Sequence, residues 1–286
     1  MKQGKQRLLR DLSAQDIARA CEQNYIDYWR CVGLSPNAEF SERGGVTQCI
    51  TGLPQEIFNV VMRCSLSTDD IEKRMDSVIG QFRSCRLTMI WHVGMLTEPK
   101  DLGRYLEARG YPHDYDLTAM AIDLDGIAEH SGLSAEVTTK TVETGEDCRG
   151  WIACLTRSWE SPKEVAPWML ENACFNTSLE REKRLSLPRK MFLGILDGAP
   201  VSASMLFWSE DIAGLQAVGT IHPGRGKGVG GATAKAALSE ARRMGFKLVV
   251  VLSTVEGVGM YEKVGFKPFG KLPEHTMDFR KRSGSR

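Results

Sequence analysis

Apolar residues recur along this chain with the periods of helices and strands, and the helical period is clearest just after the polar residues 67–70. The apolar residues that follow are Ile71, Met75, Val78, Ile79 and Phe82. Steps of three and four positions place such residues on one face of a helix. The pattern therefore predicts an amphipathic helix that buries this face.

The first half of the chain is predicted to mix helices with strands. Ser13 and Asp16 form a capping-box pattern, which opens a helix that ends near Cys31. Residues 34–45 are expected to form a loop. A later helix is expected to begin at Thr97-Glu98-Pro99 and to end at Gly110. Strands are expected at residues 46–50, 87–93 and 119–124.

The second half begins with a predicted strand at residues 136–142 and two helices near 146–159 and 162–176. Residues 191–196 and 201–208 are expected to form a hairpin, because the pair Asp197-Gly198 favours a tight turn between strands. A last strand is expected at residues 275–280.

The most informative stretch runs from residue 215 to residue 266. It predicts a strand at 215–221, a glycine-rich turn, and a helix from Val229 that Gly245 ends. A short apolar run at 248–252 follows, as in a strand that is buried on both faces. A loop and a short helix complete the stretch.

A glycine-rich turn between a strand and a helix presents several backbone N–H groups to an anion, and phosphate is the usual one. A P-loop is excluded, because Val229 follows Gly228 where the motif needs lysine. Gly226, Gly228 and Gly231 have the spacing of a dinucleotide site. The next strand, however, ends at Leu252-Ser253-Thr254 without the acidic residue that would bind a ribose.

Two motifs in this stretch have a better match. The pattern R-x-x-G-x-G occurs at Arg225, Gly228 and Gly230, and Tyr261-Glu262-Lys263-Val264-Gly265-Phe266 follows downstream. Over roughly residues 190–280 the chain resembles the GNAT superfamily of acyl-CoA-dependent N-acyltransferases. The resemblance implies an α+β fold with a mixed central sheet flanked by helices. One departure is His222, which stands where the family usually has proline; Pro223 follows one position later.

The resemblance also assigns coenzyme-binding roles. It implies that the turn holds the coenzyme A pyrophosphate and that the preceding strand pairs with the pantetheine arm. Thr254 stands where the family often has an asparagine that bonds the pantetheine. The implied coenzyme residues are Val218, Gly219, Thr220, Arg225, Gly226, Lys227, Gly228, Val229, Gly230, Gly231 and Thr254.

The resemblance implies a catalytic role for Tyr261, whose phenol would give a proton to the departing thiolate. The alternative is a tyrosine that only packs on the coenzyme. A backbone N–H near Gly219 or Thr220 would stabilise the oxyanion. Glycine within a strand often marks a bulge or a close backbone approach. Gly219 therefore fits a bulge beside the thioester, and it also fits a packing constraint. Glu210 and Asp211 are candidate bases by location only, and no base is assigned.

The order of elements in the first half is a shorter version of the order in the second. No R-x-x-G-x-G follows Val93, where residues 94–99 read Gly-Met-Leu-Thr-Glu-Pro. One hypothesis is a degenerate GNAT-like domain at 1–126 in tandem with an acetyltransferase domain at 134–286, joined by a polar linker. The alternative is an unrelated α+β domain at the N-terminal end.

Composition narrows the classes of partner and compartment. Lys and Arg number 37 against 36 Asp and Glu, so no charge excess attracts nucleic acid or an anionic membrane. No run of eighteen apolar residues and no secretion signal is present. The eight cysteines lack metal-ligand spacing and lie mostly in apolar segments, so reduced core residues in a cytoplasmic protein without a metal are expected.

These observations predict an N-acetyltransferase that moves an acetyl group from acetyl-CoA to a primary amine by direct attack. A non-catalytic acyl-CoA-binding or regulatory protein, and an N-acyltransferase with a longer acyl donor, stay as alternatives. A monomer is favoured over a homodimer, because the second domain can replace a partner subunit. The tryptophans of residues 146–176 and Trp208 either wall an acceptor pocket or fill the core.

Overall fold

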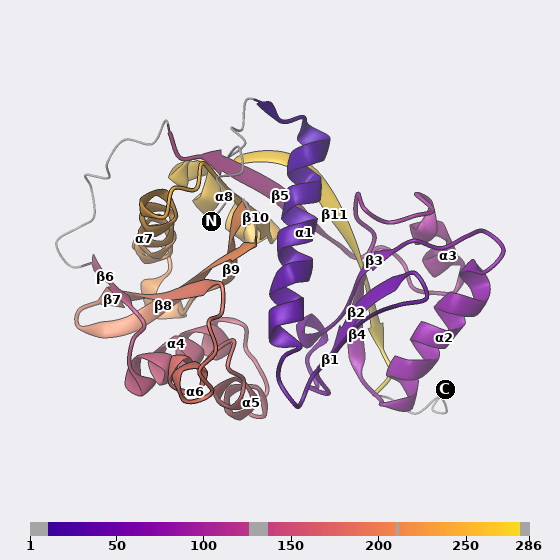
Figure 1. The fold of residues 1–286 in the computed structure, drawn as a ribbon, viewed down its shortest axis with the longest axis horizontal. Helices are drawn as coiled ribbons and strands as arrows, with labels where there is room; N and C mark the ends of the chain where they lie inside the picture. Colours follow the sequence, from indigo (N-terminus) through magenta and orange to yellow (C-terminus); the bar gives the residue numbers. More distant parts are fainter. Residues whose placement is uncertain (1–10, 126–136, 210–211, 281–286) are drawn as a thin grey trace. The chain divides into compact units, whose positions relative to one another are not determined.

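The computed structural model describes residues 11–125, 137–209 and 212–280 (Figure 1). It divides into two compact units. Unit 1 comprises residues 1–31 and 118–270, and unit 2 comprises residues 32–117 and 271–286. Each unit thus combines segments from both halves of the chain, whereas the predicted limits at 126 and 134 follow chain order. Residues 126–134 of the predicted linker lie outside the described residues.

Unit 1 is built on a mixed sheet with the strand order β5-β10-β9-β8-β7-β6. The pair β9–β10 is parallel and the other pairs are antiparallel. β5 passes from unit 2 into unit 1 at residue 118. The strands are β5 (Tyr115–Asp123), β6 (Val137–Thr141), β7 (Arg189–Leu196), β8 (Ala199–Ser209), β9 (Ile212–Thr220) and β10 (Leu248–Ser253).

Helices cover both faces of this sheet. Successive residues of a strand point to opposite faces. Leu193 of β7 faces Gly150 of α4, whereas Gly194 faces Thr233 of α7. α4 and α7 therefore lie on opposite sides of the sheet (Figure 1). The helices of unit 1 are α1 (Ala14–Val32, except its last residue), α4 (Gly145–Ser158), α5 (Val165–Glu171), α6 (Thr177–Glu182), α7 (Val229–Arg243) and α8 (Val255–Val264).

Unit 2 contains a smaller mixed sheet with the order β1-β2-β3-β4-β11. Here the parallel pair is β3–β4. The C-terminal part of β11 pairs with β4, from Glu274 opposite His92 to Asp278 opposite Thr88. The elements are β1 (Glu39–Arg43), β2 (Val46–Ile50), the short 3₁₀ helix η2 (Glu56–Phe58), β3 (Asn59–Cys64), α2 (Ile71–Ser84), β4 (Thr88–His92), α3 (Leu102–Ala108) and β11 (Lys267–Asp278).

Most predicted elements are confirmed, and the helix face predicted in α2 is buried as expected. The capping box is also confirmed, since Ser13 and Asp16 exchange hydrogen bonds at the start of α1. The loop expected at 34–45 is wrong in part, because it contains β1. β11 begins eight residues before the strand expected at 275, and the described residues include β3 and α6, which had not been predicted.

Among the described residues, no helix combines the length and the apolar character that crossing a membrane requires.

Candidate coenzyme-binding site

The glycine-rich turn after β9 has the backbone conformation that its sequence requires. Gly226 has φ 74° and Gly228 has φ 79°, which is the left-handed region that favours glycine. A Cβ added at either position would meet no other atom within 4 Å. The predicted turn is therefore present, and the space in front of it is open to a ligand.

The turn leads directly into the N-terminus of α7, with Gly228 as the N-cap. The first N–H groups of a helix have no partner within the helix, so those of Val229, Gly230 and Gly231 are suited to an anion. The side chain of Val229 is buried beneath the turn. A Cβ at Gly230 would lie 2.8 Å from Oγ1 of Thr220, so only glycine lets the helix start approach the end of β9 so closely.

Arg225 holds the turn against the strand and the neighbouring helix. Its Nε donates to the carbonyl of Thr220 at 3.0 Å, and its Nη2 donates to the carbonyl of Ser158 at 3.4 Å. Lys227 is exposed beside it. The two cations add positive charge to the helix N-terminus, and Arg225 also fixes the shape of the turn.

β9 separates from β10 where the turn begins. Their recorded pairs join residues 213–215 to residues 249–251. β9 continues to Thr220 and β10 continues to Ser253. Within the described residues, the stretch 216–220 therefore has no strand partner on its β10 side. This open edge can accept an extended ligand by strand addition.

A β-bulge lies on the same stretch of β9. Ala203 of β8 pairs with Gly219 and Met205 pairs with Gln216, so one residue of β8 faces two residues of β9. Ala217, the first of the two, has φ 47°. The bulge expected near Gly219 is thus centred on Ala217 and Val218, and bulges of this kind redirect backbone groups beside binding sites.

Gly219 itself satisfies a packing constraint. A Cβ at this position would overlap Oγ of Ser158 and would lie 3.1 Å from Cδ2 of Leu155, both on α4. Its carbonyl accepts a hydrogen bond from Oγ of Ser202 at 3.1 Å. These contacts therefore support the interpretation of Gly219 as a packing constraint.

Tyr261 and Thr254 both belong to the α8 region. The Tyr261 ring is buried, packs edge-on against Phe266 at 5.3 Å, and comes close to Gly257 one turn earlier. Burial raises the pKa of the Tyr261 phenol well above its usual value of 10, so the group stays protonated at neutral pH. Thr254 is the exposed N-cap of α8, and its hydroxyl makes no capping bond.

The tryptophans of the helical segment mostly belong to the core. Trp151 is fully buried and its Nε1 donates to the carbonyl of Ser204 at 3.0 Å. Trp168 is buried against Phe175. Trp159 and Trp208 are half-buried. The core-filling interpretation therefore holds for Trp151 and Trp168.

A polar pair on the inner side of β9 had not been predicted. Asn24 of α1 is buried, and its amide accepts a hydrogen bond from Gln216 at 2.9 Å and donates to the carbonyl of Phe207. A Cβ at Gly214 would overlap the Asn24 side chain. This pair supports β9 just before its bulge. No sequence signal identifies it, because Asn24 lies 192 positions from Gln216.

Unit 2 contains a counterpart of this strand-helix-strand motif, at β3, α2 and β4. In both units a helix connects two parallel strands. The counterpart of the glycine-rich turn therefore follows Cys64, and the expectation that it should follow Val93 is wrong. The turn in unit 2 reads Ser65-Leu66-Ser67-Thr68-Asp69-Asp70, with no glycine and two carboxylates. Negative charge at a helix N-terminus disfavours a pyrophosphate.

Two further differences separate the motifs. In unit 2 the end of β3 is covered by its own chain, since the N–H of Glu98 donates to Cys64 at 2.7 Å and Leu66 donates to Glu98 at 3.0 Å. The second difference lies in the helix after the second parallel strand, α3 in unit 2 and α8 in unit 1. The chain leaves both helices in the same way, since the N–H of Tyr111 donates to the carbonyl of Leu106 and the N–H of Phe266 donates to the carbonyl of Tyr261. Leu106 thus stands where unit 1 has its tyrosine. The described part of unit 2 therefore has no counterpart of the open turn, the open edge or the phenol.

No family model and no curated protein matches this sequence. Solved structures do match over nearly the whole chain. A GCN5-related N-acetyltransferase from Kribbella flavida is 14% identical, with a TM-score of 0.63 over 93% of this chain and 95% of that one. A second, from Sphaerobacter thermophilus, is 16% identical, with a TM-score of 0.60 over 95% and 94%.

A tandem GNAT protein from the clavulanic acid biosynthesis pathway is 14% identical, with a TM-score of 0.53 over 94% of this chain and 97% of that one. Identities this low show a common fold. The predicted α+β class, with a mixed sheet flanked by helices, is confirmed, and an unrelated N-terminal domain is not what the structure shows. This chain has the GNAT fold in a tandem GNAT-like arrangement.

Proposed function

We propose that unit 1 is an N-acetyltransferase that moves an acetyl group from acetyl-CoA to a primary amine by direct attack. One observation carries the proposal: the open edge of β9 at residues 216–220 runs straight into an open glycine-rich turn at the start of α7. This combination suits a ligand with an extended, amide-bearing arm and a pyrophosphate. Acetyl-CoA is such a ligand, and it supplies the activated thioester.

The residues of unit 1 would divide the work of binding. The N–H groups of the turn, from Gly226 to Gly231, together with Arg225 and Lys227, bind the pyrophosphate. The edge at Val218, Gly219 and Thr220 aligns the pantetheine arm, and the Thr254 hydroxyl bonds to it. The bulge at Ala217 redirects backbone N–H groups towards the thioester oxygen, where negative charge develops during attack.

Tyr261 is the proposed acid for the departing thiolate. Its raised pKa keeps the proton on the phenol but makes the transfer more unfavourable than it is for an ordinary tyrosine. A short donor–acceptor distance in the complex would have to compensate. No residue is assigned as the base for the amine, and the candidates Glu210 and Asp211 lie outside the described residues. We expect the chain to act as a monomer.

Because unit 2, as far as the structure describes it, has no counterpart of the open turn, the open edge and the phenol, the proposal expects each chain to bind one coenzyme. Calorimetric titration with acetyl-CoA, with coenzyme A and NADH as comparison ligands, tests this directly. The proposal expects binding of acetyl-CoA and coenzyme A with a stoichiometry near one and no binding of NADH. Binding of NADH alone, or of none of the three, would refute it.

Turnover is tested separately, by thiol release in the presence of a panel of primary amines. Acetyl-CoA binding without thiol release for any amine would favour the non-catalytic alternative. Faster release from a longer acyl-CoA than from acetyl-CoA would favour the alternative with a longer donor. Both outcomes leave the binding site itself in place, so the claims about binding and about chemistry can fail independently.

A further inference from the structure

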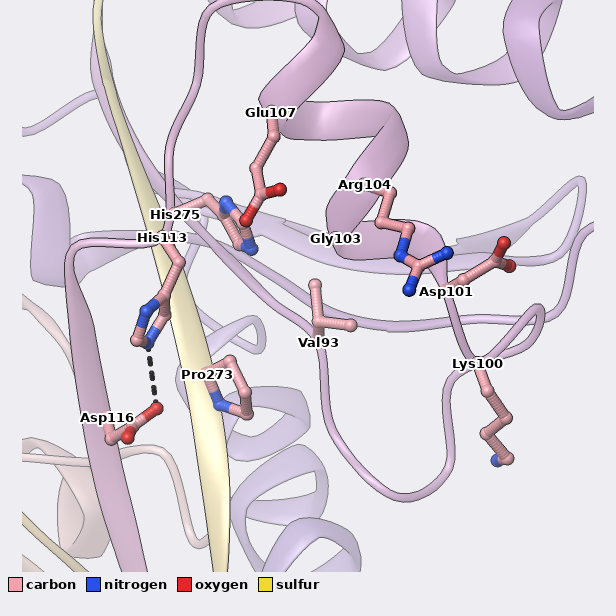
Figure 2. Close-up of a pocket in the computed structure, with 10 residues that line it drawn as sticks. All are labelled: Val93, Lys100, Asp101, Gly103, Arg104, Glu107, His113, Asp116, Pro273 and His275. Carbon is pink, nitrogen blue, oxygen red and sulfur yellow. Dashed lines mark hydrogen bonds and ion pairs between the residues drawn. The ribbon is translucent and has the colours of Figure 1, made fainter.

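Unit 2 has a pocket of its own, although its described residues have no counterpart of the open turn and open strand edge of unit 1. The pocket has a volume of about 560 Å³, within the range of small-molecule sites. α3 lies on one side of it and residues 113–116 on the other, with residues 273–275 of β11 between them (Figure 2). Val93 and Pro273 form its apolar surface. All of these residues belong to unit 2, so the pocket is a property of that unit alone.

A buried histidine presents a hydrogen-bond acceptor to this pocket. His275 is only 2% exposed, and its Nδ1 lies 2.9 Å from the carbonyl oxygen of Tyr111. A carbonyl oxygen can only accept, so Nδ1 carries the proton. In the neutral ring Nε2 then has a lone pair. That nitrogen faces Gly103, another residue that lines the pocket.

Gly103 keeps the space in front of this nitrogen open. A Cβ at position 103 would lie 3.3 Å from Nε2 of His275, which is tighter than an ordinary contact. The backbone of α3 does not need glycine here, because Gly103 has no positive φ. The glycine therefore leaves room beside the imidazole.

α3 and its N-cap bring one cation, Arg104, and two anions, Asp101 and Glu107, to the pocket. Arg104 and Glu107 both line it (Figure 2), and within the described residues the structure records no hydrogen bond or ion pair for either side chain. Lys100, by contrast, is engaged by Glu98 and by two carbonyl groups of its own loop. Positions three apart on a helix have Cβ atoms about 5–6 Å apart, so one molecule of about four carbons can contact both side chains.

The side of the pocket opposite α3 adds a further carboxylate, that of Asp116. Nε2 of His113 lies 2.9 Å from the Asp116 carboxylate, and both residues line the pocket. Glu107, Asp116 and the lone pair of His275 together offer acceptors to a donor-rich group. Arg104 offers donors to a carboxylate.

We propose that this pocket binds a small molecule with a primary ammonium group at one end and a carboxylate at the other. The ammonium group donates to Nε2 of His275 and to Glu107, and the carboxylate accepts from Arg104. A dicarboxylate or phosphate would face the acidic end unfavourably, and a diamine would face Arg104. The site is distinct from the coenzyme site of unit 1 and does not rest on the acyltransferase function.

Saturation-transfer NMR with length-matched probes tests the proposal on the full chain. γ-Aminobutyrate carries both groups, butylamine carries the amine alone, and butyrate carries the carboxylate alone. We expect γ-aminobutyrate to bind about tenfold more tightly than butylamine, because it adds one charged hydrogen-bonded contact, and butyrate to bind least. Equal binding of butyrate and γ-aminobutyrate, or no binding of any probe at about 10 mM, would overturn the proposal.

Variants assign the ends of the ligand. Arg104→Gln should reduce the affinity for γ-aminobutyrate to that for butylamine and leave butylamine unchanged. Glu107→Gln should weaken both. Glu39→Gln, which changes an exposed carboxylate of β1 outside the pocket, is the matched control and should change neither.

Gly103→Ala separates binding from folding. Alanine favours a helix more than glycine does, which opposes the cost of a Cβ 3.3 Å from Nε2 of His275, so the melting temperature should change little. The added methyl group beside Nε2 of His275 should nevertheless abolish binding of γ-aminobutyrate. Unchanged binding in this variant would contradict the proposed position of the ammonium group. Acetyl-CoA titration of the same variant should match wild type, and Gly228→Asp should retain γ-aminobutyrate binding.

Discussion

In unit 2, Nδ1 of His92 lies 3.3 Å from Oε1 of Glu274, and both side chains are buried. Burial lowers the pKa of His92 from 6.5 to about 3. Burial, followed by the charges of Asp114, Asp116 and Glu56, raises the pKa of Glu274 from 4.5 to about 7. The histidine is therefore neutral at neutral pH, and the carboxyl group titrates near pH 7.

These two groups make opposite contributions to the pH dependence of stability. In the folded chain Glu274 keeps its proton up to a higher pH than in the unfolded chain. Its contribution to the free energy of unfolding therefore falls as the pH rises from 4.5 to about 7. In the unfolded chain His92 becomes protonated at a higher pH than in the folded chain. Its contribution to the free energy of unfolding therefore falls as the pH drops from 6.5 to about 3. Between pH 4.5 and 6.5 the two slopes oppose each other.

Glu274→Gln should remove the contribution of Glu274 and leave that of His92 to the pH dependence of the free energy of unfolding. We expect the variant to lose unfolding free energy as the pH falls from 6.5 to 4.5, by up to about 1.4 kcal/mol per pH unit relative to wild type. Urea unfolding followed by circular dichroism across this range measures it, with Glu39→Gln as the control. Parallel profiles for Glu274→Gln and wild type would rule out the titration of Glu274.

Gly228→Asp should abolish acetyl-CoA binding, because it places bulk and negative charge at the proposed pyrophosphate site. It also forces a side chain into φ 79°, which costs about 1–2 kcal/mol of stability. Gly198→Asp is the matched control, since Gly198 has φ 77° in the β7–β8 turn and open space around it. Equal coenzyme affinity in the two variants, measured by calorimetry, would show that the turn does not bind the coenzyme.

Tyr261→Phe should reduce kcat about 10²–10⁴-fold while leaving acetyl-CoA affinity within about twofold, because only proton transfer is lost. In wild type the raised pKa of Tyr261 should keep the phenol protonated beyond pH 10, so deprotonation of this residue should not lower the rate below that pH. Tyr105→Phe, which removes a phenol from unit 2, is the control. An unchanged kcat for Tyr261→Phe would leave this tyrosine with a packing role alone.

Gly219→Ala should destabilise the protein by about 1–3 kcal/mol, because its methyl group would overlap Ser158. Ser158→Ala in the same chain should recover much of this loss. A double-mutant cycle of urea unfolding free energies measures the coupling. Additive effects of the two substitutions would mean that the contact between Gly219 and Ser158 is not limiting.

Cys31 and Cys174 should form a disulfide on mild oxidation. Their sulfur atoms lie 3.4 Å apart inside unit 1, and the hydrogen bond with Cys174 and the charge of Arg189 lower the pKa of the Cys31 thiol. Hydrogen peroxide would oxidise the Cys31 thiolate to a sulfenic acid. The Cys174 thiol would then attack the sulfenic sulfur, which forms the disulfide and releases the hydroxyl group as water.

Mass spectrometry of the intact oxidised chain should then show the loss of two hydrogen atoms. Peptide mapping should locate the link between Cys31 and Cys174. Cys174→Ser should prevent this product, and Cys154→Ser should not affect it. Oxidation that leaves this pair as free thiols would contradict the prediction.

Local patterns were enough to predict the elements that carry strong periodicity or turn chemistry. The apolar face of α2, the Asp197-Gly198 hairpin and the turn at Gly226 and Gly228 were all visible in the sequence, because each depends on neighbouring residues. β1 was missed because four of its five residues, Glu-Phe-Ser-Glu-Arg, are polar and three are exposed. Without β3, the counterpart of the glycine-rich turn was placed one strand too late.

Long-range contacts explain what the sequence could not predict about the site. The separation of β9 from β10, the bulge at Ala217, and the overlap that only Gly219 avoids all depend on strands and helices brought together by folding. Asn24 supports β9 from a helix nearly two hundred positions earlier in the chain. Such pairings leave no local pattern, so the sequence supports a proposal for the site residues but does not predict how the site is shaped.

Unit 2 combines residues 32–117 with a segment from the other half of the chain, and this has a consequence for the synthesis of the protein. β4 of unit 2 pairs with residues 274–278 of β11, which follow every other described strand in the sequence. A ribosome releases residues 32–117 long before that partner strand exists, although domains usually fold from the N-terminal end as they emerge. Unit 2 must therefore stay incomplete until residues 274–278 have been synthesised, and until then β4 lacks one of its two partner strands.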